Sequence, residues 1–115
     1  EQRMNITIVP YKLPDSVPTP KDECGWIALY DNKAIGWNSL LFLSDKTIKF
    51  ANAYVEEEYR GNGIYRMLWD ARWEWCQENL KGYKVITYCL PTTHGFYKDK
   101  GWEEGHTSTL FTSKI

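Results

Sequence analysis

The sequence predicts an α/β (α+β) fold, in which a central mixed and mostly antiparallel sheet carries one long helix and one short helix. Its 115 residues are 43% apolar and 25% charged, which is ordinary for a single globular domain. Apolar runs separated by turn-forming residues, typical of strands, fill the chain as far as Val55. After Gly63 the apolar residues recur with a helical period, and a further apolar run follows that helix. We therefore expect one domain over residues 1–115.

The first half of the chain predicts strands that pair in sequence order as an antiparallel meander. The run NITIVPY, residues 5–11, is a candidate strand that we expect Pro10 to end. Residues 13–23 are rich in proline and should form an irregular connection. Asp31 and Asn32 have the chemistry of a hairpin turn between two longer apolar runs. The meander is then formed by residues 25–32, 33–45 and 47–57.

The second half of the chain predicts a strand, a crossover helix and a parallel strand. Apolar residues from Ile64 to Leu80 form two helical stripes, so this helix is either broadly buried or offers one side to a partner. The apolar run of residues 83–91 follows the helix, so it should lie parallel to the strand that precedes the helix. A short helix over Thr92–Lys100 should stop at Gly101, and at least one more strand should follow.

Composition and charge argue against several classes of function. Lys plus Arg is 14 against 15 for Asp plus Glu, a formal charge of -1, so we expect no nucleic acid and no membrane as a partner. The longest apolar cluster is far shorter than a membrane span, and the N-terminal EQRMN lacks the features of a signal peptide. Cys24, Cys76 and Cys89 lack a C-x-x-C spacing, which favours buried reduced thiols in a cytoplasmic protein. With only two histidines besides, the sequence predicts no metal site.

The stretch VEEEYRGNGIYRML, residues 55–68, places two glycines between a candidate strand and a candidate helix. The first N–H groups of a helix have no acceptor within it, and the helix dipole adds positive potential, so this junction is suited to an anion. Gly61 and Gly63 would let the backbone approach a pyrophosphate, and Arg60 could add a charge-assisted hydrogen bond. The alternative is an ordinary turn that needs glycine for positive φ, with Arg60 solvated. The loop alone does not decide between the two.

Two common phosphate-binding loops do not fit, whereas a third does. A Walker A loop needs lysine and then serine or threonine where Ile64 and Tyr65 stand, and a Rossmann loop needs glycine where Arg66 stands. VEEEYRGNGIY instead resembles the signature [Q/R]-x-x-G-x-[G/A] of the GNAT superfamily of acetyl-CoA-dependent N-acyltransferases, with its common lead-in. The stretch FYKDKGW, residues 96–102, resembles the F/L-Y-x-K-x-G-F motif of the same family, with one helix and one strand between the two motifs.

The resemblance covers about Trp26 to the C-terminus and implies a function. It implies direct transfer of the acetyl group of acetyl-CoA to a primary amine of a protein, peptide or small molecule. It also implies that loop N–H groups bind the pyrophosphate, that the splayed strand edge binds the pantetheine, and that an N–H near Tyr54 or Val55 stabilises the oxyanion. The implied cofactor-binding residues are Ala53, Tyr54, Val55, Arg60, Gly61, Asn62, Gly63, Ile64, Tyr65, Thr92 and Thr93.

The same resemblance suggests Tyr97 as the general acid that protonates the departing CoA thiolate. A phenol is a weaker acid than a thiol, so this transfer is slightly uphill but workable within a hydrogen bond. The general base is less defined: Glu56 and Glu57 lie closest in sequence, and His94 sits one turn before Tyr97. Each has a simpler explanation, because a glutamate run is usually a solvated face, a lone histidine is more often structural, and Tyr97 could be a packing residue.

The departures from the family pattern leave alternatives open. Tyr65 stands where the family keeps glycine or alanine, so its ring could crowd the cofactor. The two N-terminal helices that usually wall the acceptor site are reduced to Leu13–Glu23, which leaves that groove open or completed by a second subunit in a homodimer. A catalytically inactive GNAT-fold module that binds acyl-CoA or a protein partner is therefore the alternative to an active enzyme. An unrelated α/β domain with a plain glycine turn is the third hypothesis.

Overall fold

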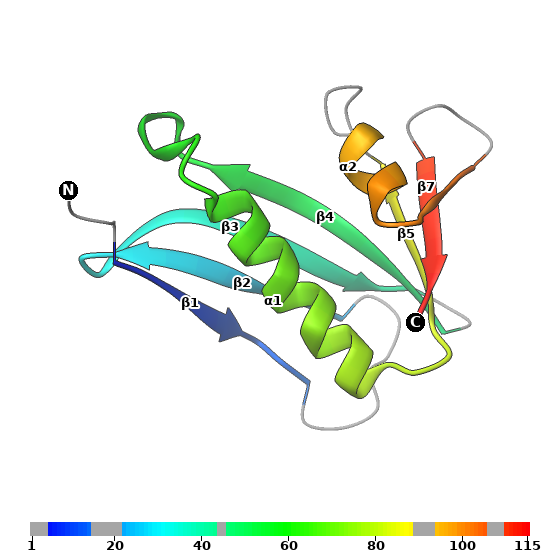
Figure 1. Cartoon of the computed structure of the whole chain (residues 1–115). Helices are drawn as coiled ribbons and strands as arrows, with labels where there is room; N and C mark the ends of the chain where they lie inside the picture. Colours follow the sequence, from blue (N-terminus) through cyan, green and yellow to red (C-terminus); the bar gives the residue numbers. More distant parts are fainter. Residues whose placement is uncertain (1–4, 15–21, 44–45, 89–93, 106–109) are drawn as a thin grey trace.

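The computed structural model of the chain describes residues 5–14, 22–43, 46–88, 94–105 and 110–115 (Figure 1). Within these residues, seven strands form one sheet in the order β1-β2-β3-β4-β5-β7-β6, and the β4–β5 pair alone is parallel. The predicted fold class, a mostly antiparallel mixed sheet with one long and one short helix, is confirmed. The strands are β1 (Ile6–Tyr11), β2 (Glu23–Tyr30), β3 (Lys33–Phe42), β4 (Thr47–Val55), β5 (Lys84–Tyr88), β6 (Glu103–Glu104) and β7 (Leu110–Lys114). The helices are α1 (Ile64–Asn79), α2 (His94–Asp99) and a single 3-10 turn, η1 (Glu57–Tyr59).

The meander forms where the turn chemistry predicts it. Asp31 and Asn32 join β2 to β3 with φ values of 51° and 63°, the left-handed backbone that a two-residue hairpin turn requires. The prediction that Pro10 ends the first strand is wrong, because β1 continues to Tyr11. β1 is an edge strand, where proline is tolerated because its missing N–H can face away from the sheet. Most of the proline-rich connection lies outside the described residues.

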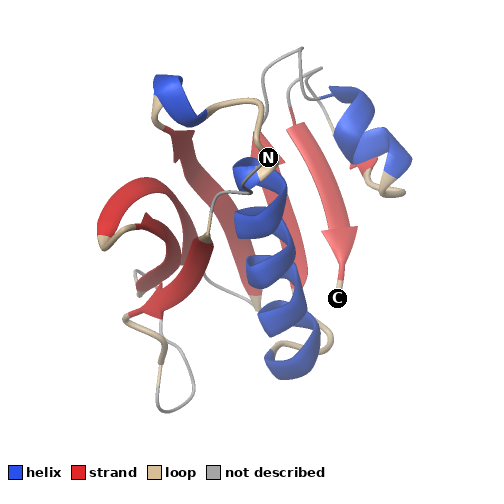
Figure 2. Ribbon diagram, turned by 60° about the vertical axis from the view of Figure 1, so that its left-hand side comes forward, coloured by secondary structure: helices blue, strands red, loops and turns tan. Residues whose placement is uncertain are grey.

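Helix α1 lies across one face of the sheet (Figures 1 and 2) and buries Ile64, Leu68 and Trp69 against it. It also buries a side chain that the apolar pattern did not predict. Arg72 is 1% exposed, and its Nη1 donates to the carbonyl of Ser39 on β3 at 2.9 Å. Burial lowers the pKa of Arg72 from 12.5 to about 10, because the interior solvates the charged form poorly. In the described part of the chain, no helix has the length and the apolar character needed to cross a membrane.

Helix α2 is held against α1 and the sheet by an aromatic cluster, which accounts for much of the high aromatic content. The Trp69 ring centroid lies 5.3 Å from that of Phe96, and the Tyr97 centroid lies 5.1 Å from that of Trp102. The tryptophan stripe of α1 thus packs against the chain itself, so it no longer argues for a partner subunit. The rings of the cluster are Phe50, Trp69, Trp73, Phe96, Tyr97, Trp102 and Phe111.

Candidate functional site

Strands β4 and β5 pair at one end and diverge at the other. Residues Thr47–Phe50 of β4 pair with Lys84–Thr87 of β5, whereas beyond Phe50 the recorded partner of β4 is β3 alone. Figure 1 shows the two strands diverging: β5 runs toward α2, whereas β4 runs toward the loop that follows it. The predicted splay is therefore confirmed for the described residues. Among the described residues this leaves a gap in the hydrogen-bond ladder on the side of Ala51–Val55 that faces away from β3, where another extended chain could form backbone hydrogen bonds.

A bulge in β4 decides which backbone groups face that gap. The register with β3 shifts between Trp37 and Ser39, and Asn52 has a φ of 54° at the same level. Past the bulge, the Glu56 N–H donates to β3 at 2.8 Å. Because bonding direction alternates along an antiparallel strand, Tyr54 also bonds toward β3 and Val55 points its N–H and C=O toward the gap. Of the two predicted oxyanion donors, the register therefore favours Val55.

The loop between η1 and α1 uses glycine for its backbone conformation. Gly61 and Gly63 have φ values of 83° and 77°, which most other residues adopt only with strain. A Cβ built at either glycine would meet no heavy atom within 4 Å in the described part of the chain. Positive φ therefore explains both glycines, and the open space around them also leaves room for a ligand.

The N-terminal end of α1 carries no side-chain cap. Gly63 occupies the N-cap position, the first turn contains no acidic residue, and the first helical bond runs from Met67 N–H to the Gly63 carbonyl at 3.0 Å. Asn62 is the nearest residue able to cap, but its Nδ2 instead donates to the Tyr59 carbonyl at 2.9 Å. The positive end of the helix dipole therefore meets an exposed loop, which is the arrangement of an anion site.

Arg60 links this loop to the end of β4. Its Nε donates to the Val55 carbonyl at 2.8 Å, and its guanidinium carbon lies 5.4 Å from the ring centroid of Tyr54. The bond confirms that the Val55 carbonyl points away from β3. It also places a permanent positive charge where the β4 edge and the α1 terminus meet.

Tyr97 lies at the level where the β4–β5 pairing ends. Phe50, Thr87 and Phe111 form a row across β4, β5 and β7, and the Tyr97 ring stacks on Phe111 with centroids 5.8 Å apart. Tyr97 is 2% exposed, and its hydroxyl accepts a hydrogen bond from Trp69 Nε1 at 3.2 Å. Tyr97, the predicted general acid, thus lies inside the aromatic cluster, beside the point where β4 and β5 diverge. We call this point the fork.

Comparison with known proteins agrees with this geometry. The acetyltransferase (GNAT) domain family matches residues 21–104 of the chain.

The chain belongs to the GNAT acetyltransferase family.

Solved structures share the fold of this GNAT domain at low sequence identity. A putative acetyltransferase from Exiguobacterium is 15% identical with a TM-score of 0.72, covering 96% of this chain and 94% of its own. A GNAT family acetyltransferase from Elizabethkingia anophelis with acetyl-CoA bound is 18% identical with a TM-score of 0.70, covering 96% and 99%. The IAA acetyltransferase from Bacillus cereus is 15% identical with a TM-score of 0.70, covering 96% and 100%. No curated protein matches the sequence.

The other predicted catalytic residues of the GNAT domain lie on both sides of the fork. Glu56 is half-buried directly after Val55, while Glu57 and Glu58 are exposed on η1. Glu58 Oε1 lies 3.7 Å from Lys33 Nζ between two exposed side chains, so that ion pair adds little stability. His94 begins α2, but its side chain falls outside the described residues, as do Thr92 and Thr93 in full.

Tyr65 is half-buried between the two helices of the GNAT domain. Its ring packs edge-on against Phe96 of α2, with centroids 5.9 Å apart. This contact gives the ring a structural task in joining α1 to α2. The sequence predicted a cofactor-binding position at Tyr65 and a ring that could crowd the cofactor, but not this packing role, because the packing partner lies on another helix.

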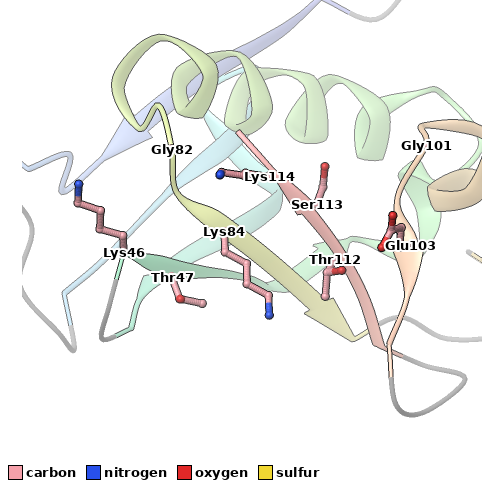
Figure 3. Close-up of a pocket in the computed structure, with 9 residues that line it drawn as sticks. All are labelled: Lys46, Thr47, Gly82, Lys84, Gly101, Glu103, Thr112, Ser113 and Lys114. Carbon is pink, nitrogen blue, oxygen red and sulfur yellow. The ribbon is translucent and has the colours of Figure 1, made fainter.

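The described residues of the GNAT domain also line hollows that were not predicted. One, of about 450 Å³, lies between α1 and α2 and is lined by Arg66, Phe96, Asp99 and Lys100. Another, of about 660 Å³, lies beyond the C-terminal end of α1 (Figure 3). Its polar side chains do not converge, since Lys46 and Lys84 point away from each other. This second hollow is lined by Lys46, Thr47, Gly82, Lys84, Gly101, Glu103, Thr112, Ser113 and Lys114.

Proposed function

We propose that this chain is an N-acetyltransferase that moves the acetyl group of acetyl-CoA directly to a primary amine of a protein, peptide or small molecule. The observation that carries the proposal is the meeting of two features at Arg60: the open edge of β4 and the uncapped end of α1. The cofactor has a matching pair of parts, an extended amide-bearing arm and a pyrophosphate. Family membership and the structurally similar Elizabethkingia protein with acetyl-CoA bound support the same co-substrate.

The residues of the loop and strand divide the work of binding. Backbone N–H groups of Gly61, Asn62, Gly63 and Ile64 hold the pyrophosphate, and the Arg60 charge assists them. The free edge from Ala53 to Val55 bonds the pantetheine amides as an added strand would. Tyr54 contributes its ring beside Arg60, and Tyr65 borders the same terminus from the α2 side.

Chemistry then takes place at the fork. The Val55 N–H donates to the thioester carbonyl oxygen and stabilises the negative charge that develops on it. Tyr97 donates its hydroxyl proton to the sulfur as the carbon–sulfur bond breaks. Glu56 and His94 are the candidates for the base that removes a proton from the attacking amine, and Thr92 and Thr93 are candidates for polar contacts to the cofactor.

One observation favours a second candidate function. Tyr97 is 2% exposed and already hydrogen-bonded, as a purely structural tyrosine would be. A GNAT-fold module that binds acyl-CoA or a protein partner without catalysis would have the same features.

Two measurements on the purified chain test the proposal. Calorimetric titration with acetyl-CoA should show binding, and at about 100 times its Kd the ligand should add about 2.7 kcal/mol of stability. Incubation with acetyl-CoA and a panel of amines should release free thiol, and Tyr97→Phe should slow that release without changing Kd. Binding without thiol release for any amine would favour the inactive module, and absence of binding would contradict both functions.

The cellular setting follows from other features. Cys24 and Cys76 are both buried and free, which supports a reducing compartment such as the cytoplasm. We also propose a homodimer, in which the second subunit would complete the acceptor groove. Sedimentation measures the oligomeric state, and a monomer at every concentration would contradict the dimer.

A further inference from the structure

The hydrogen bond between Trp69 and Tyr97 has a fixed direction. An indole nitrogen is a donor only, so Trp69 Nε1 donates and the Tyr97 oxygen accepts at 3.2 Å. The tyrosine proton cannot point at Trp69 and is therefore directed elsewhere. Within the described residues, Trp69 is the recorded hydrogen-bond partner of this hydroxyl. The phenol thus keeps its proton available for a third group.

If Tyr97 loses its proton, the hydrogen bond donated by Trp69 becomes important because of the side chains around the tyrosine ring. The ring is packed among Trp69, Phe96, Trp102 and Phe111, with centroids between 5.1 and 6.2 Å from its own. Aromatic surroundings solvate an anion poorly, so a phenolate here would be costly without a donor. The indole N–H bonds a phenolate more strongly than a phenol, because a charged acceptor strengthens the bond.

Two cations also face this pair of side chains. Arg72 is fully buried on α1 three residues after Trp69, with its guanidinium carbon 3.9 Å from the Phe50 centroid, and its charge interacts with Tyr97. Lys100, just after α2, places Nζ 4.4 Å from the Trp69 centroid and 3.7 Å from Asp70 Oδ1. Arg72 has no carboxylate partner among the recorded ion pairs of the described residues. A transient negative charge on Tyr97 would therefore meet uncompensated positive charge.

We propose that Trp69 is a positioning residue for acetyl transfer, which directs the Tyr97 proton toward the CoA sulfur and stabilises the phenolate that remains. The inference rests on the proposed function. In the step, the amine nitrogen bonds to the thioester carbon and the carbon–sulfur bond breaks. The sulfur takes the Tyr97 proton to become a thiol, the base takes one proton from the amine, and Tyr97 regains its proton from that base through solvent. The total number of protons is therefore the same before and after the step.

Trp69→Phe tests this role because it keeps a ring and removes the N–H. We expect kcat to fall about tenfold, the cost of a hydrogen bond to a charged group, while the acetyl-CoA Kd stays within about twofold. The alkaline limb of the kcat profile should move to higher pH, because loss of the N–H favours the protonated hydroxyl. Trp73→Phe is the matched control, since it removes an indole from the same helix and the same cluster, 5.6 Å away between centroids.

A double-mutant cycle separates positioning from packing. In a Tyr97→Phe background, Trp69→Phe should cost no further activity, because the acceptor of its bond is gone. An equal loss in both backgrounds, or an unchanged kcat and pH profile in the single variant, would overturn the inference while leaving an active enzyme. A wild-type chain that binds acetyl-CoA and releases no thiol would instead contradict the proposed function.

A spectroscopic measurement covers the case in which Trp69→Phe fails to fold. The ¹⁵N-labelled indole resonance of Trp69 should move upfield in Tyr97→Phe, which keeps the ring and removes only the acceptor oxygen. The Trp73 resonance should move much less. A Trp69 resonance that stays in place would show that the hydrogen bond is absent, and the inference would be wrong.

Discussion

The two ends of α1 use the same residue in the same conformation but are completed differently. Gly63 precedes the helix with a φ of 77°, and Gly82 follows it with a φ of 85°; a Cβ at either would meet no atom of the described residues within 4 Å. At the C-terminal end the chain supplies the partners: Gly82 N–H donates to the Ile115 carbonyl, and Ile115 N–H donates to the Tyr83 carbonyl, both at 2.9 Å. At the N-terminal end no side chain caps the helix.

This difference shows what a glycine beside a helix does and does not indicate. Positive φ explains both glycines equally, so the residue type alone is no evidence for a ligand. What distinguishes the ends is that Ile115, just after β7, bonds to the chain that leaves α1, whereas the other end faces an exposed loop and the open edge of β4. We propose that the cofactor binds at the end that the chain leaves open.

Matched alanine substitutions at the two ends of α1 should give the largest difference in acetyl-CoA affinity. Gly63→Ala and Gly82→Ala should each lose about 1–2 kcal/mol of unfolding free energy, because both place a Cβ at positive φ. Only Gly63→Ala should weaken acetyl-CoA binding, by at least about thirtyfold, since its methyl group occupies the space that the pyrophosphate needs. Urea unfolding and calorimetry measure the two effects. Equal affinity in both variants would break the comparison.

Removing the positive charge of Arg60, at the N-terminal end of α1, should have the next largest effect on acetyl-CoA affinity. Arg60→Ala should raise the acetyl-CoA Kd about tenfold, because it removes a charge-assisted hydrogen bond and the tie to Val55. The effect should shrink with added salt. Lys81→Ala, an exposed lysine at the closed end, is the control and should leave Kd unchanged. If the two substitutions weakened binding equally, general charge and not a site would be responsible.

Tyr65 tests the same comparison because it lies in the first turn of α1, at the end that faces the exposed loop. Tyr65→Ala should cost about 1–2 kcal/mol of stability through its lost packing on Phe96, while the acetyl-CoA Kd should change by less than about threefold. Thermal denaturation and calorimetry provide both values. Binding that tightened about tenfold would show that the ring obstructs the cofactor.

The two buried thiols, Cys24 on β2 and Cys76 on α1, should give the smallest effect. Burial raises the pKa of Cys24 and of Cys76 from 9.0 to about 12, because the interior disfavours thiolates. Both thiols therefore stabilise the fold below pH 9, and this contribution is lost as the pH rises toward 12. In a Cys89→Ser background, a thiol reagent at pH 8 should react only after unfolding. Rapid reaction of the native protein would contradict their burial.

Local chemistry made most of the fold predictable. The Asp31-Asn32 turn, the helix beginning at Ile64 and the parallel β4–β5 pair each follow from a pattern within a few residues or from the handedness of a crossover. Pro10 was misjudged because its tolerance depends on β1 being an edge strand, which is a property of the whole sheet. Arg72 was missed because a charged residue in a helical pattern is normally read as solvent-facing.

The candidate site was predictable only in outline. The family motifs indicated the loop and Tyr97, and the splay of the strands followed from the same resemblance. The choice of Val55 over Tyr54 needed the bulge register, which sequence spacing does not reveal. The Trp69–Tyr97 bond joins residues 28 positions apart, so no local pattern carries it.

A titration of the ¹⁵N-labelled chain with acetyl-CoA, followed through its glycine amide resonances, tests the central claim most directly. We predict that the resonances of Gly61 and Gly63 shift with a common saturation curve, while those of Gly82 and Gly101, which line the hollow beyond the C-terminal end of α1, stay in place. Shifts at Gly82 and Gly101 with none at Gly61 and Gly63 would contradict the assignment of the cofactor to the open end of α1.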